Sequence, residues 1–509
     1  MYASSNGIIP AMPPWSAAPR LYEINTRVWL AELSRQQQRP LTLALVPDEA
    51  LEEIAAAGFE AVWLMGVWTT GAAATAEART PERMAEWRRA LPDAETADVP
   101  GSPYAISAYE VATALGGDAA LAGLRERLAR LRLRLVLDFV PNHTACDHPL
   151  VAASPECFVP GDEDDLRRDP GSFFRGPSGA VLAHGRDPYF PAWTDTAQLN
   201  YGHPAAREAM ADALLAVASQ CDGVRCDMAM LLLPDVIERV WGPRLDASWV
   251  RESFWGEWIP RVRTQHPDFL FIAEAYWGLE PRLQGEGFDF TYDKALYDAL
   301  AHGNVGAVRA HLARPTSAQR REARFLENHD EPRAALTFGA RATAAAAVTY
   351  LSPGLKLFHE GQLEGFTVKL PVQLSRRPQE RPDSATHAFY RRILDILREP
   401  AFGEGSFLPV EAAPAGPGDG SCAQILAFLR QAPYHAHTDL GWLIVANLGN
   451  ERAYARVKLP LALDPRRSYR FDDRLNRAIY DRDGAELSQA GLFVALDPYA
   501  AHVFCVETA

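Results

Sequence analysis

The sequence predicts an α/β fold: a closed (β/α)8 TIM barrel with a subdomain inserted after strand 3 and a C-terminal antiparallel β domain. Short apolar runs alternate with amphipathic helical stretches from about residue 21, which is typical of βα units and a parallel sheet. Eight such runs occur, the number that a closed barrel of this kind requires. No G-x-G-x-x-G pattern follows the first run, so an open dinucleotide-binding sheet is not favoured.

We expect the strands where aliphatic, β-branched and aromatic residues cluster between turn residues. In chain order the eight predicted strands are Leu21–Trp29, Ala61–Trp68, Leu133–Val140, Gly223–Met228, Phe269–Tyr276, Phe288–Asp293, Arg324–His329 and Leu355–His359. Helical periodicity is found between most of them, with predicted helices at Asp48–Ala57, Asp118–Leu131, Pro204–Ser219 and His387–Leu397.

The pattern divides the chain into three predicted domains. Residues 15–142 and 201–400 would form the barrel, residues 143–200 the inserted subdomain, and residues 401–509 a C-terminal β-sandwich. The last region follows a Pro/Gly-rich joint and consists of short alternating segments: Ile425–Leu429, Trp442–Asn447, Tyr454–Lys458, Tyr469–Phe471 and His502–Val506. The insertion leaves the C-terminal end of a strand, which is the end of a barrel where active sites are built.

Composition and charge exclude several classes of partner. The 509 residues are 48% hydrophobic and 23% charged, as in ordinary globular proteins. Sixty-five acidic and 51 basic residues leave a net charge of −14, which repels nucleic acid and anionic lipid. No apolar stretch approaches the roughly 20 residues that cross a bilayer, and no secretory signal is recognised. Six cysteines without CxxC spacing indicate reduced thiols, so we expect a cytoplasmic protein that binds a neutral, soluble ligand.

Polar residues interrupt the ends of four of the predicted strands. Asp138 and Asn142-His143 close the third, Arg225-Cys-Asp227 the fourth, Glu274 the fifth, and Glu327-Asn-His329-Asp330 the seventh. Residues two apart in a strand share a face, so Arg225 would lie beside Asp227 and keep it ionised. Buried ionisable groups are costly unless paired, and their recurrence at one end of a barrel therefore indicates a catalytic site.

Each of these residues also has a structural interpretation. A single carboxylate at a strand end is more often an ion-pair partner, and Asp138 would serve Arg225 in that way. Asn142 would be a turn or cap residue, and Glu327 would point away from the mouth of the barrel. Asp227, Glu274 and Asp330 occur together at three separate strand ends, which chance does not readily explain.

These motifs resemble those of a known family. The four strand-end segments look like the conserved motifs of the α-amylase family, glycoside hydrolase family 13. They occur in the order of the family, on strands three, four, five and seven. The segments are Asp138-Phe-Val-Pro-Asn-His143, Gly223-Val-Arg-Cys-Asp227, Phe271-Ile-Ala-Glu274-Ala, and Glu327-Asn-His-Asp330 with Arg333. The segment from Gly101 to Tyr109 resembles the tyrosine-bearing loop of the family, with Tyr104. The resemblance runs from about residue 20 to the end of the chain.

The resemblance implies a role for each matching residue. Asp227 would be the nucleophile and Glu274 the general acid and base, about 5 to 5.5 Å apart, as in a retaining mechanism. Asp330 would bind sugar hydroxyls in the transition state. The substrate-binding residues would be Tyr104, stacked beneath the ring, together with His143, Arg225, His329 and Arg333.

The sequence also departs from the family pattern. Met230 and Leu231 stand where many members carry a Lys-His pair on the leaving-group side, and His359 and Glu360 stand where tyrosines are common. Family members often bind a structural calcium through the asparagine that matches Asn142, so calcium at Asn142 is an expectation of the resemblance. The chemistry itself requires no cofactor.

The resemblance implies a retaining α-glycoside hydrolase acting on α-glucosides or short α-glucans by double displacement. The same three carboxylates also serve transglycosylases and isomerases, so an α-glucanotransferase-like activity is the first alternative. A metal-dependent hydrolase using Asp138, His143, His329 and Asp330 is a second, although no HExxH motif occurs. A non-catalytic sugar-binding relative is a third.

Overall fold

A computed structural model describes residues 12–245, 252–433 and 439–509 of the chain. Eight strands close into a parallel barrel in the order β1-β14-β13-β12-β11-β10-β5-β2, which confirms the predicted fold class. Their bounds are β1 (Arg20–Asn25), β2 (Ala61–Met65), β5 (Arg134–Phe139), β10 (Gly223–Cys226), β11 (Leu270–Ala273), β12 (Phe290–Tyr292), β13 (Glu322–Arg324) and β14 (Leu355–His359). Every residue of β5, β10 and β11 is buried, as expected for strands covered on both faces.

Helices follow most of the barrel strands, and their ends carry the expected signals. The helix α2 (Asp48–Ala57) has the predicted bounds, because Gly58 adopts φ +96° and ends it. Pro204 begins α8 (Pro204–Gln220), where a missing N–H costs nothing. The other main helices are α1 (Thr26–Gln36), α5 (Gly117–Arg130), α9 (Pro234–Trp241), α10 (Phe254–Gln265), α11 (Glu280–Glu286), α12 (Lys294–Ala301), α13 (Val305–Leu312), α16 (Ala342–Leu351) and α17 (Ser384–Ile396).

Most of the predicted strands are shorter in the structure, and two of them depart furthest from their predicted bounds. The first ends at Asn25, whose side chain accepts a hydrogen bond from the N–H of Val28 and caps α1, so the last four residues of the predicted strand are helical. The seventh strand lies earlier in the chain than predicted and ends at Arg324. The segment around Asn328 is a turn instead, because its Oδ1 accepts from the N–H groups of both Asp330 and Glu331.

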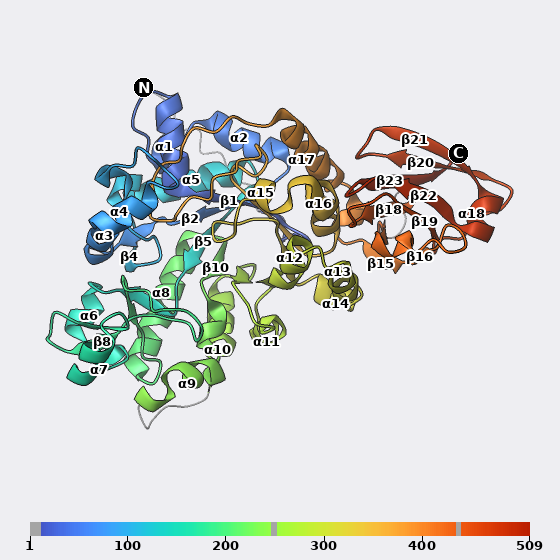
Figure 1. Cartoon of the computed structure of the whole chain (residues 1–509). Helices are drawn as coiled ribbons and strands as arrows, with labels where there is room; N and C mark the ends of the chain where they lie inside the picture. The colour runs from blue at the N-terminus through green and yellow to red at the C-terminus, as the bar shows by residue number, and fades with distance from the viewer. Residues whose placement is uncertain (1–11, 246–251, 434–438) are drawn as a thin grey trace. The chain divides into compact units, whose positions relative to one another are not determined.

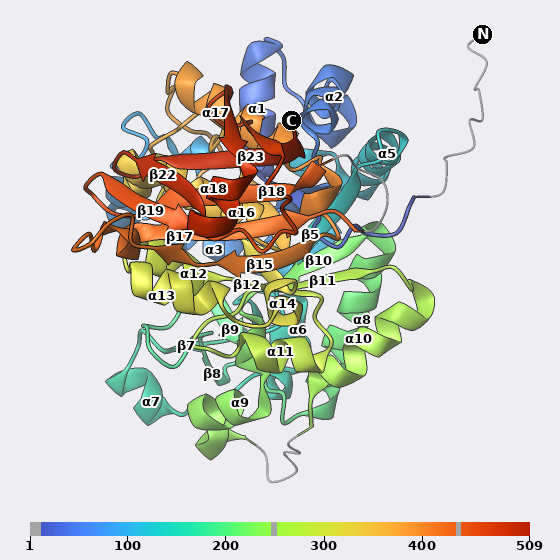
Figure 2. The ribbon, with the colours of Figure 1, turned by 90° about the vertical axis from the view of Figure 1, so that its right-hand side faces the viewer.

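The insertion after β5 consists of short elements. Two small sheets pair β6 (His143–Ala145) with β9 (Thr196–Gln198) and β7 (Phe173–Arg175) with β8 (Val181–Ala183), beside the short helices α6 (Pro149–Ala153) and α7 (Glu163–Arg168). Val159, Phe173 and Val181 of this segment pack on Trp241 of α9. The insertion and α9 accordingly lie together in both ribbon views (Figures 1 and 2).

The C-terminal region is antiparallel. A six-stranded sheet has the order β15-β17-β18-β23-β20-β21 and a three-stranded sheet the order β16-β19-β22, with α18 (Gly484–Ala490) alongside. Apolar side chains from both sheets form one core, which includes Leu429, Val445, Val457, Phe471 and Val494. The strands are β15 (Ser406–Val410), β16 (Ala412–Ala413), β17 (Ile425–Gln431), β18 (Asp439–Asn447), β19 (Ala453–Val457), β20 (Ser468–Asp473), β21 (Ala478–Asp483), β22 (Leu492–Leu496) and β23 (Ala501–Thr508).

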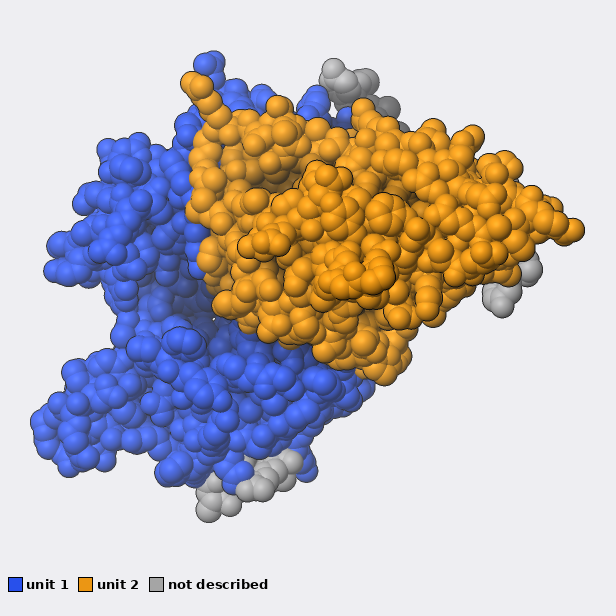
Figure 3. Space-filling view, turned by 45° about the vertical axis from the view of Figure 1, so that its right-hand side comes forward, with its two compact units in different colours: residues 1–14, 22–292, 368–379 blue, residues 15–21, 293–367, 380–509 orange. Residues whose placement is uncertain are grey.

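The chain separates into two compact units (Figure 3). The first comprises residues 1–14, 22–292 and 368–379 and contains the strands β2, β5, β10, β11 and β12 with the insertion. The second comprises residues 15–21, 293–367 and 380–509 and contains β13, β14 and the C-terminal sheets. The three-domain division by residue number stays a prediction. Within the described residues, every helix is too short or too polar to span a bilayer.

Candidate active site

The buried guanidinium of Arg225 bridges two of the predicted catalytic carboxylates. Arg225 is the third residue of β10 and is 1% exposed. Its Nη1 donates to Oδ1 of Asp227 at 2.7 Å, and its Nη2 lies 2.8 Å from Oε2 of Glu274. Charge-assisted contacts of this kind are strong and directional. One cation therefore holds both carboxylates at one place.

Backbone hydrogen bonds between neighbouring barrel strands fix the positions of Asp227 and Glu274. The N–H of Asp227, directly after β10, donates to the carbonyl of Phe139 on β5, and the N–H of Glu274, directly after β11, donates to the carbonyl of Cys226. Asp227 is 7% exposed and Glu274 is 4% exposed, so neither side chain is directed into bulk solvent. Adjacent strands thus present both groups at their carboxyl ends, where barrel enzymes place catalytic residues.

Aromatic rings and a third carboxylate surround the same guanidinium. The rings of Trp63, Tyr104 and Tyr292 lie 5.3, 5.4 and 5.8 Å from its central carbon. Asp138, the register partner of Arg225 on β5, lies 3.7 Å from Nη1, and its supporting role stays a prediction. Burial acts to lower the pKa of Arg225, but Glu274 and the surrounding groups outweigh it and raise that pKa well above its usual value. The guanidinium is a permanent charge at the site.

Glu274 has two further donors that the sequence analysis did not identify. The N–H of Met228 donates to Oε2 at 2.6 Å, and the hydroxyl of Tyr276 donates to Oε1 at 2.7 Å. Met228 adopts φ +42°, which turns the chain after Asp227 so that its N–H faces Glu274. The only sequence signal for Tyr276 is its position two residues after Glu274, where an extended segment places side chains on one face.

Replacing Tyr276 by phenylalanine tests this contact. We expect Tyr276→Phe to lower kcat about tenfold with little change in KM, because a hydrogen bond to a charged group contributes about 1.5 to 3 kcal/mol and the other donors to Glu274 remain. Steady-state kinetics on maltotriose measures the effect. A kcat equal to that of the unmodified chain would show that the hydroxyl does not orient Glu274 during turnover.

His143 lies on β6 in the same unit and is buried. Burial lowers the pKa of its imidazole, while the nearby charge of Asp227 and a hydrogen bond to the backbone of Tyr104 act in the opposite direction. Its ring lies 5.1 Å from that of Trp193 in the insertion. The structure therefore brings together His143, Tyr104, Arg225, Asp227 and Glu274, five of the residues predicted for the site.

Asn142 has a partner where the resemblance implies calcium. Its Oδ1 accepts a hydrogen bond from Nε2 of Gln198 at 3.1 Å, its backbone carbonyl accepts from the same nitrogen at 2.9 Å, and its Nδ2 lies 3.2 Å from Oε1 of Gln198. Calcium takes six to eight oxygen ligands, usually with carboxylates among them. Both oxygens of Asn142 face an amide N–H₂ group, so this donor set does not fit calcium.

The amide pair predicts how the chain responds to chelation. We expect EDTA to leave the midpoint of thermal unfolding unchanged, since the amide of Gln198 ties β9 to the segment after β5 without a metal. Gln198→Ala should instead lower the free energy of unfolding by about 1 to 3 kcal/mol, because Asn142 loses its partner in a buried position. A fall of several degrees on chelation, reversed by added calcium, would contradict this expectation.

The third predicted carboxylate lies in the second unit, on the segment after β13. Oδ2 of Asp330 is 3.0 Å from Nε2 of His329. The side chain of Asp330 is 43% exposed, whereas that of His329 is 3% exposed. The turn centred on Asn328 holds the backbone of this segment. The assignment of both residues to sugar binding stays a prediction.

Arg333 belongs to a buried network in the same unit. Its guanidinium lies 3.1 Å from Oε1 of Glu327, contacts Nδ1 of His359 at 2.8 Å, and donates to the carbonyl of Glu360 at 2.9 Å. Glu327 is fully buried and also accepts from the N–H of Ala334, as expected for a structural residue. Burial raises the pKa of Glu327 to about 7, although Arg333 acts to lower it. Protein groups thus surround Arg333, and its predicted contact with substrate stays a prediction.

The raised pKa of Glu327 has a consequence for stability. Between pH 4.5 and pH 7 the folded chain keeps this proton and the unfolded chain releases it, so stability falls as the pH rises. Across that range the loss is about 3 kcal/mol. We expect Glu327→Gln to lack this loss, so that its free energy of unfolding approaches or exceeds that of the unmodified chain toward pH 7. Urea unfolding at several pH values measures the free energy of unfolding of both proteins. The same fall with pH in the two proteins would contradict this expectation.

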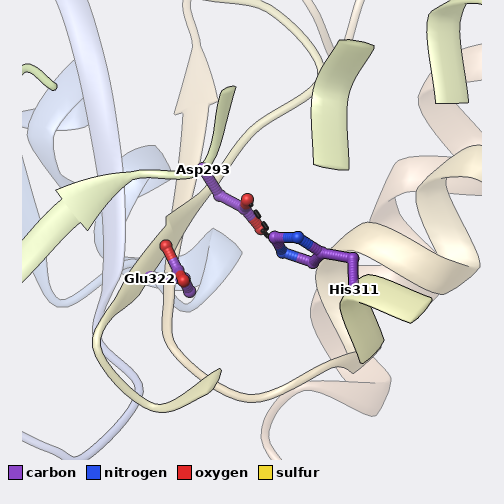
Figure 4. A group of neighbouring side chains, drawn as sticks. All are labelled: Asp293, His311 and Glu322. Atoms are coloured by element: carbon purple, nitrogen blue, oxygen red, sulfur yellow. Dashed lines mark hydrogen bonds and ion pairs between the residues drawn. The ribbon is translucent and has the colours of Figure 1, made fainter. Parts of the chain in front are cut away.

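A separate buried cluster combines residue types that bind metals. Asp293, His311 and Glu322 each offer an atom within 4.8 Å of the others, and Nε2 of His311 lies 2.9 Å from Oδ1 of Asp293 (Figure 4). Arginines already occupy this cluster, because Arg324 contacts Asp293 and Arg314 contacts Glu322 at 2.5 Å. Two guanidinium groups would repel a bound cation. The arrangement is therefore an ion-pair network.

Comparison with known proteins gives a consistent match. A family model described as the catalytic domain of α-amylase matches residues 49–401. The curated protein α-amylase MalA of Haloarcula japonica is 24% identical over 470 residues, which are 89% of this chain and 58% of that protein. The chain thus spans less than two thirds of the length of this relative.

Solved structures share the fold. The maltogenic α-amylase AmyB of Thermotoga neapolitana superposes with a TM-score of 0.69 and 18% identity, covering 97% of this chain and 99% of that chain. The isomaltulose synthase of Erwinia rhapontici gives a TM-score of 0.63 and 15% identity over 98% and 100% of the two chains. At these identities the likeness shows the fold alone.

Proposed function

The chain belongs to the α-amylase family, and on that premise we propose that it is a retaining α-glycosidase acting on α-glucosides or short α-glucans. The observation that carries the proposal is the single guanidinium of Arg225 shared by Asp227 and Glu274. A retaining mechanism needs two carboxyl groups close together, one as nucleophile and one as acid and base. A shared cation supports that spacing.

Each residue has a defined part in the proposed reaction. An oxygen of Asp227 attacks the anomeric carbon while the glycosidic C–O bond breaks, and Glu274 gives its proton to the leaving oxygen. A water molecule or a sugar hydroxyl then attacks the same carbon, loses its proton to Glu274, and releases Asp227. Arg225 keeps Asp227 anionic between the two steps. No metal or cofactor takes part in either step.

The remaining predicted residues bind the sugar in this proposal. The ring of Tyr104 offers an apolar face to a pyranose, and His143 donates a hydrogen bond to one of its hydroxyls. By its match to the family motif, Asp330 accepts from sugar hydroxyls and does so more strongly as the oxocarbenium-like transition state forms. His329 and Arg333 assist from the segment after β13. The support for these last three roles is their match to the family motif.

Product analysis tests the proposal and separates hydrolysis from transfer. Purified protein is given maltose, sucrose and maltotriose in turn, and the products are followed by NMR with resolution of the anomers. Release of α-configured glucose supports a retaining hydrolase, whereas new disaccharides or an isomerised sucrose support transfer or isomerisation. Products of β configuration would exclude the double displacement. Failure of a fluorinated glycosyl donor to label Asp227, together with no turnover, would indicate a non-catalytic sugar-binding relative.

A further inference from the structure

The side chain of Glu327 closes the turn that carries Asp330. Its Oε2 accepts from the N–H of Ala334 at 2.6 Å, and its Oε1 lies 3.1 Å from Nη1 of Arg333. Both partners lie at the far end of the turn, so a single carboxylate joins residue 327 to residues 333 and 334. Asp330 lies midway between the two ends. These contacts make residues 327–334 a closed loop centred on Asp330.

Two further side chains hold the inner part of this turn. Oδ1 of Asn328 accepts from the N–H groups of Asp330 and Glu331, both at 2.9 Å. Glu331 lies 3.3 Å from Nζ of Lys294, the first residue of α12. The side chain of Asp330 is 43% exposed, whereas that of Glu327 is 1% exposed. The buried members of the turn therefore determine where its exposed carboxylate lies.

The end of β14 supports the turn from outside. His359 is the last residue of this strand, and its Nδ1 lies 3.0 Å from Oε1 of Glu327 and 2.8 Å from Nη1 of Arg333. The backbone of His359 is fixed as well, because its N–H donates to Oε1 of Gln362 at 3.2 Å and its carbonyl accepts from the N–H of Gln362 at 2.9 Å. The imidazole thus holds the closing carboxylate against β14.

The chain after β14 leaves space for the guanidinium of Arg333. Nη2 of Arg333 donates to the carbonyl of Glu360 at 2.9 Å. Gly361 adopts φ +88°, and a β-carbon at this position would collide with the same Nη2 and with the ring of Phe366. Glycine is the residue that takes this backbone conformation without strain and leaves the space open. The local structure is therefore built around Arg333, which in turn contacts Glu327.

Burial makes this arrangement specific. Glu327 is fully buried, Arg333 is 5% exposed and His359 is 8% exposed. Buried charged groups are costly unless they are paired and hydrogen-bonded, so few alternative arrangements of these side chains are accessible. A network of this kind fixes one conformation of the backbone that it joins. Here that backbone is the turn of Asp330.

We propose that Glu327 and His359 are positioning residues that fix the turn of Asp330 and so determine how this carboxylate meets the sugar. The proposal rests on the function proposed above, in which Asp330 accepts from sugar hydroxyls as the transition state forms. A displacement of about 1 Å can lower a rate about 100-fold without any change in the reacting groups. Glu327 and His359 act through Asp330 and contact no sugar themselves.

A double-mutant cycle tests whether Glu327 acts through Asp330. We measure kcat/KM for the unmodified chain, Glu327→Leu, Asp330→Ala and the double variant, with α-glucosyl fluoride because its reactive leaving group keeps slow variants measurable. Glu327→Leu should lower kcat/KM about 100-fold in the unmodified chain. In the Asp330→Ala background the same substitution should cost less than about threefold, because the position of the turn no longer matters.

Conservative variants separate the contacts within the network. Glu327→Gln keeps an oxygen that accepts from the N–H of Ala334, so its kcat/KM should stay within about threefold of that of the unmodified chain. His359→Phe removes Nδ1 but leaves Arg333 beside Glu327, and it should lower kcat/KM about tenfold. This loss should also disappear in the Asp330→Ala background.

A similar carboxylate in the C-terminal sheets provides the matched control. Asp473 is fully buried, accepts from the N–H groups of Leu475 and Asn476 at 3.2 Å each, and lies 2.5 Å from Nδ1 of His502. It therefore also closes a turn with the help of a histidine. Asp473→Leu should lower the midpoint of thermal unfolding, as Glu327→Leu does, but leave kcat/KM unchanged.

The outcomes distinguish this proposal from the proposed function. No turnover by the unmodified chain, or full activity of Asp330→Ala, would show that the proposed function or the role of Asp330 in it is wrong, and the positioning role would be wrong with it. If Asp330→Ala is slow, an equal loss from Glu327→Leu in both backgrounds, or no loss in either, would overturn the positioning role alone. Should Glu327→Leu fail to fold, the cycle of His359→Phe with Asp330→Ala is decided by the same criterion.

Discussion

Replacing Asp227 by alanine is expected to lower kcat by at least about 10⁴-fold on any substrate that the chain accepts, equivalent to about 5.5 kcal/mol or more of transition-state stabilisation. The substitution removes the carboxylate that forms the covalent intermediate in the proposed mechanism. The fold should remain, because Arg225 still has Glu274 at 2.8 Å and Asp138 at 3.7 Å as partners. Turnover of maltotriose and thermal unfolding measure the two effects separately.

A rescue experiment gives the positive evidence. In Asp227→Gly the space of the lost side chain can admit azide, which attacks the anomeric carbon and should yield a glycosyl azide of inverted configuration. Asp289 provides a control, since it directly precedes β12 and pairs with Arg263 at 2.8 Å. Asp289→Asn should change stability but leave kcat nearly unaltered. Near-normal turnover by purified Asp227→Ala would refute the assignment of the nucleophile.

The barrel could be predicted from the sequence because its strands are apolar runs separated by helical periodicity. The misplaced bounds have local causes. The run of apolar residues after Asn25 fits a strand or a helix equally well, and the capping contact to Val28 decides for a helix. Asn328 likewise turns the chain at Asp330 through its own side chain. Such hydrogen bonds depend on geometry that hydrophobic patterning does not record.

The site was predictable to the extent that neighbouring residues define it. Arg225 lies on β10 and Asp227 directly follows the strand, two residues on, so their ion pair follows from extended geometry. The amide pair of Asn142 and Gln198 joins positions 56 residues apart and is formed only when the insertion folds back on β6. The rings of Tyr189 in the insertion and Trp277 after β11, with centroids 4.9 Å apart, are likewise far apart in the sequence. Long-range contacts of this kind require the tertiary structure.

Removing the charge of Arg225 is expected to have the largest effect on stability. The side chain is 1% exposed and contacts Asp227 and Glu274 directly, with Asp138 at 3.7 Å. In Arg225→Met these carboxylates would share a buried region without a cation. Breaking a buried ion pair costs about 3 to 5 kcal/mol, a large part of the 5 to 15 kcal/mol that stabilises a typical domain. Urea unfolding measures the loss.

A second substitution shows whether this loss comes from uncompensated charge. In the Arg225→Met background, Asp227→Asn removes one of the repelling carboxylates and should recover part of the stability, although the same change in the unmodified chain has a small effect. Arg225→Lys keeps the charge but has no planar fork to reach both carboxylates, so it should fold and have low kcat. Additive effects of Arg225→Met and Asp227→Asn would mean that Arg225 stabilises the barrel by packing against Trp63, Tyr104 and Tyr292 and not by bridging the two carboxylates.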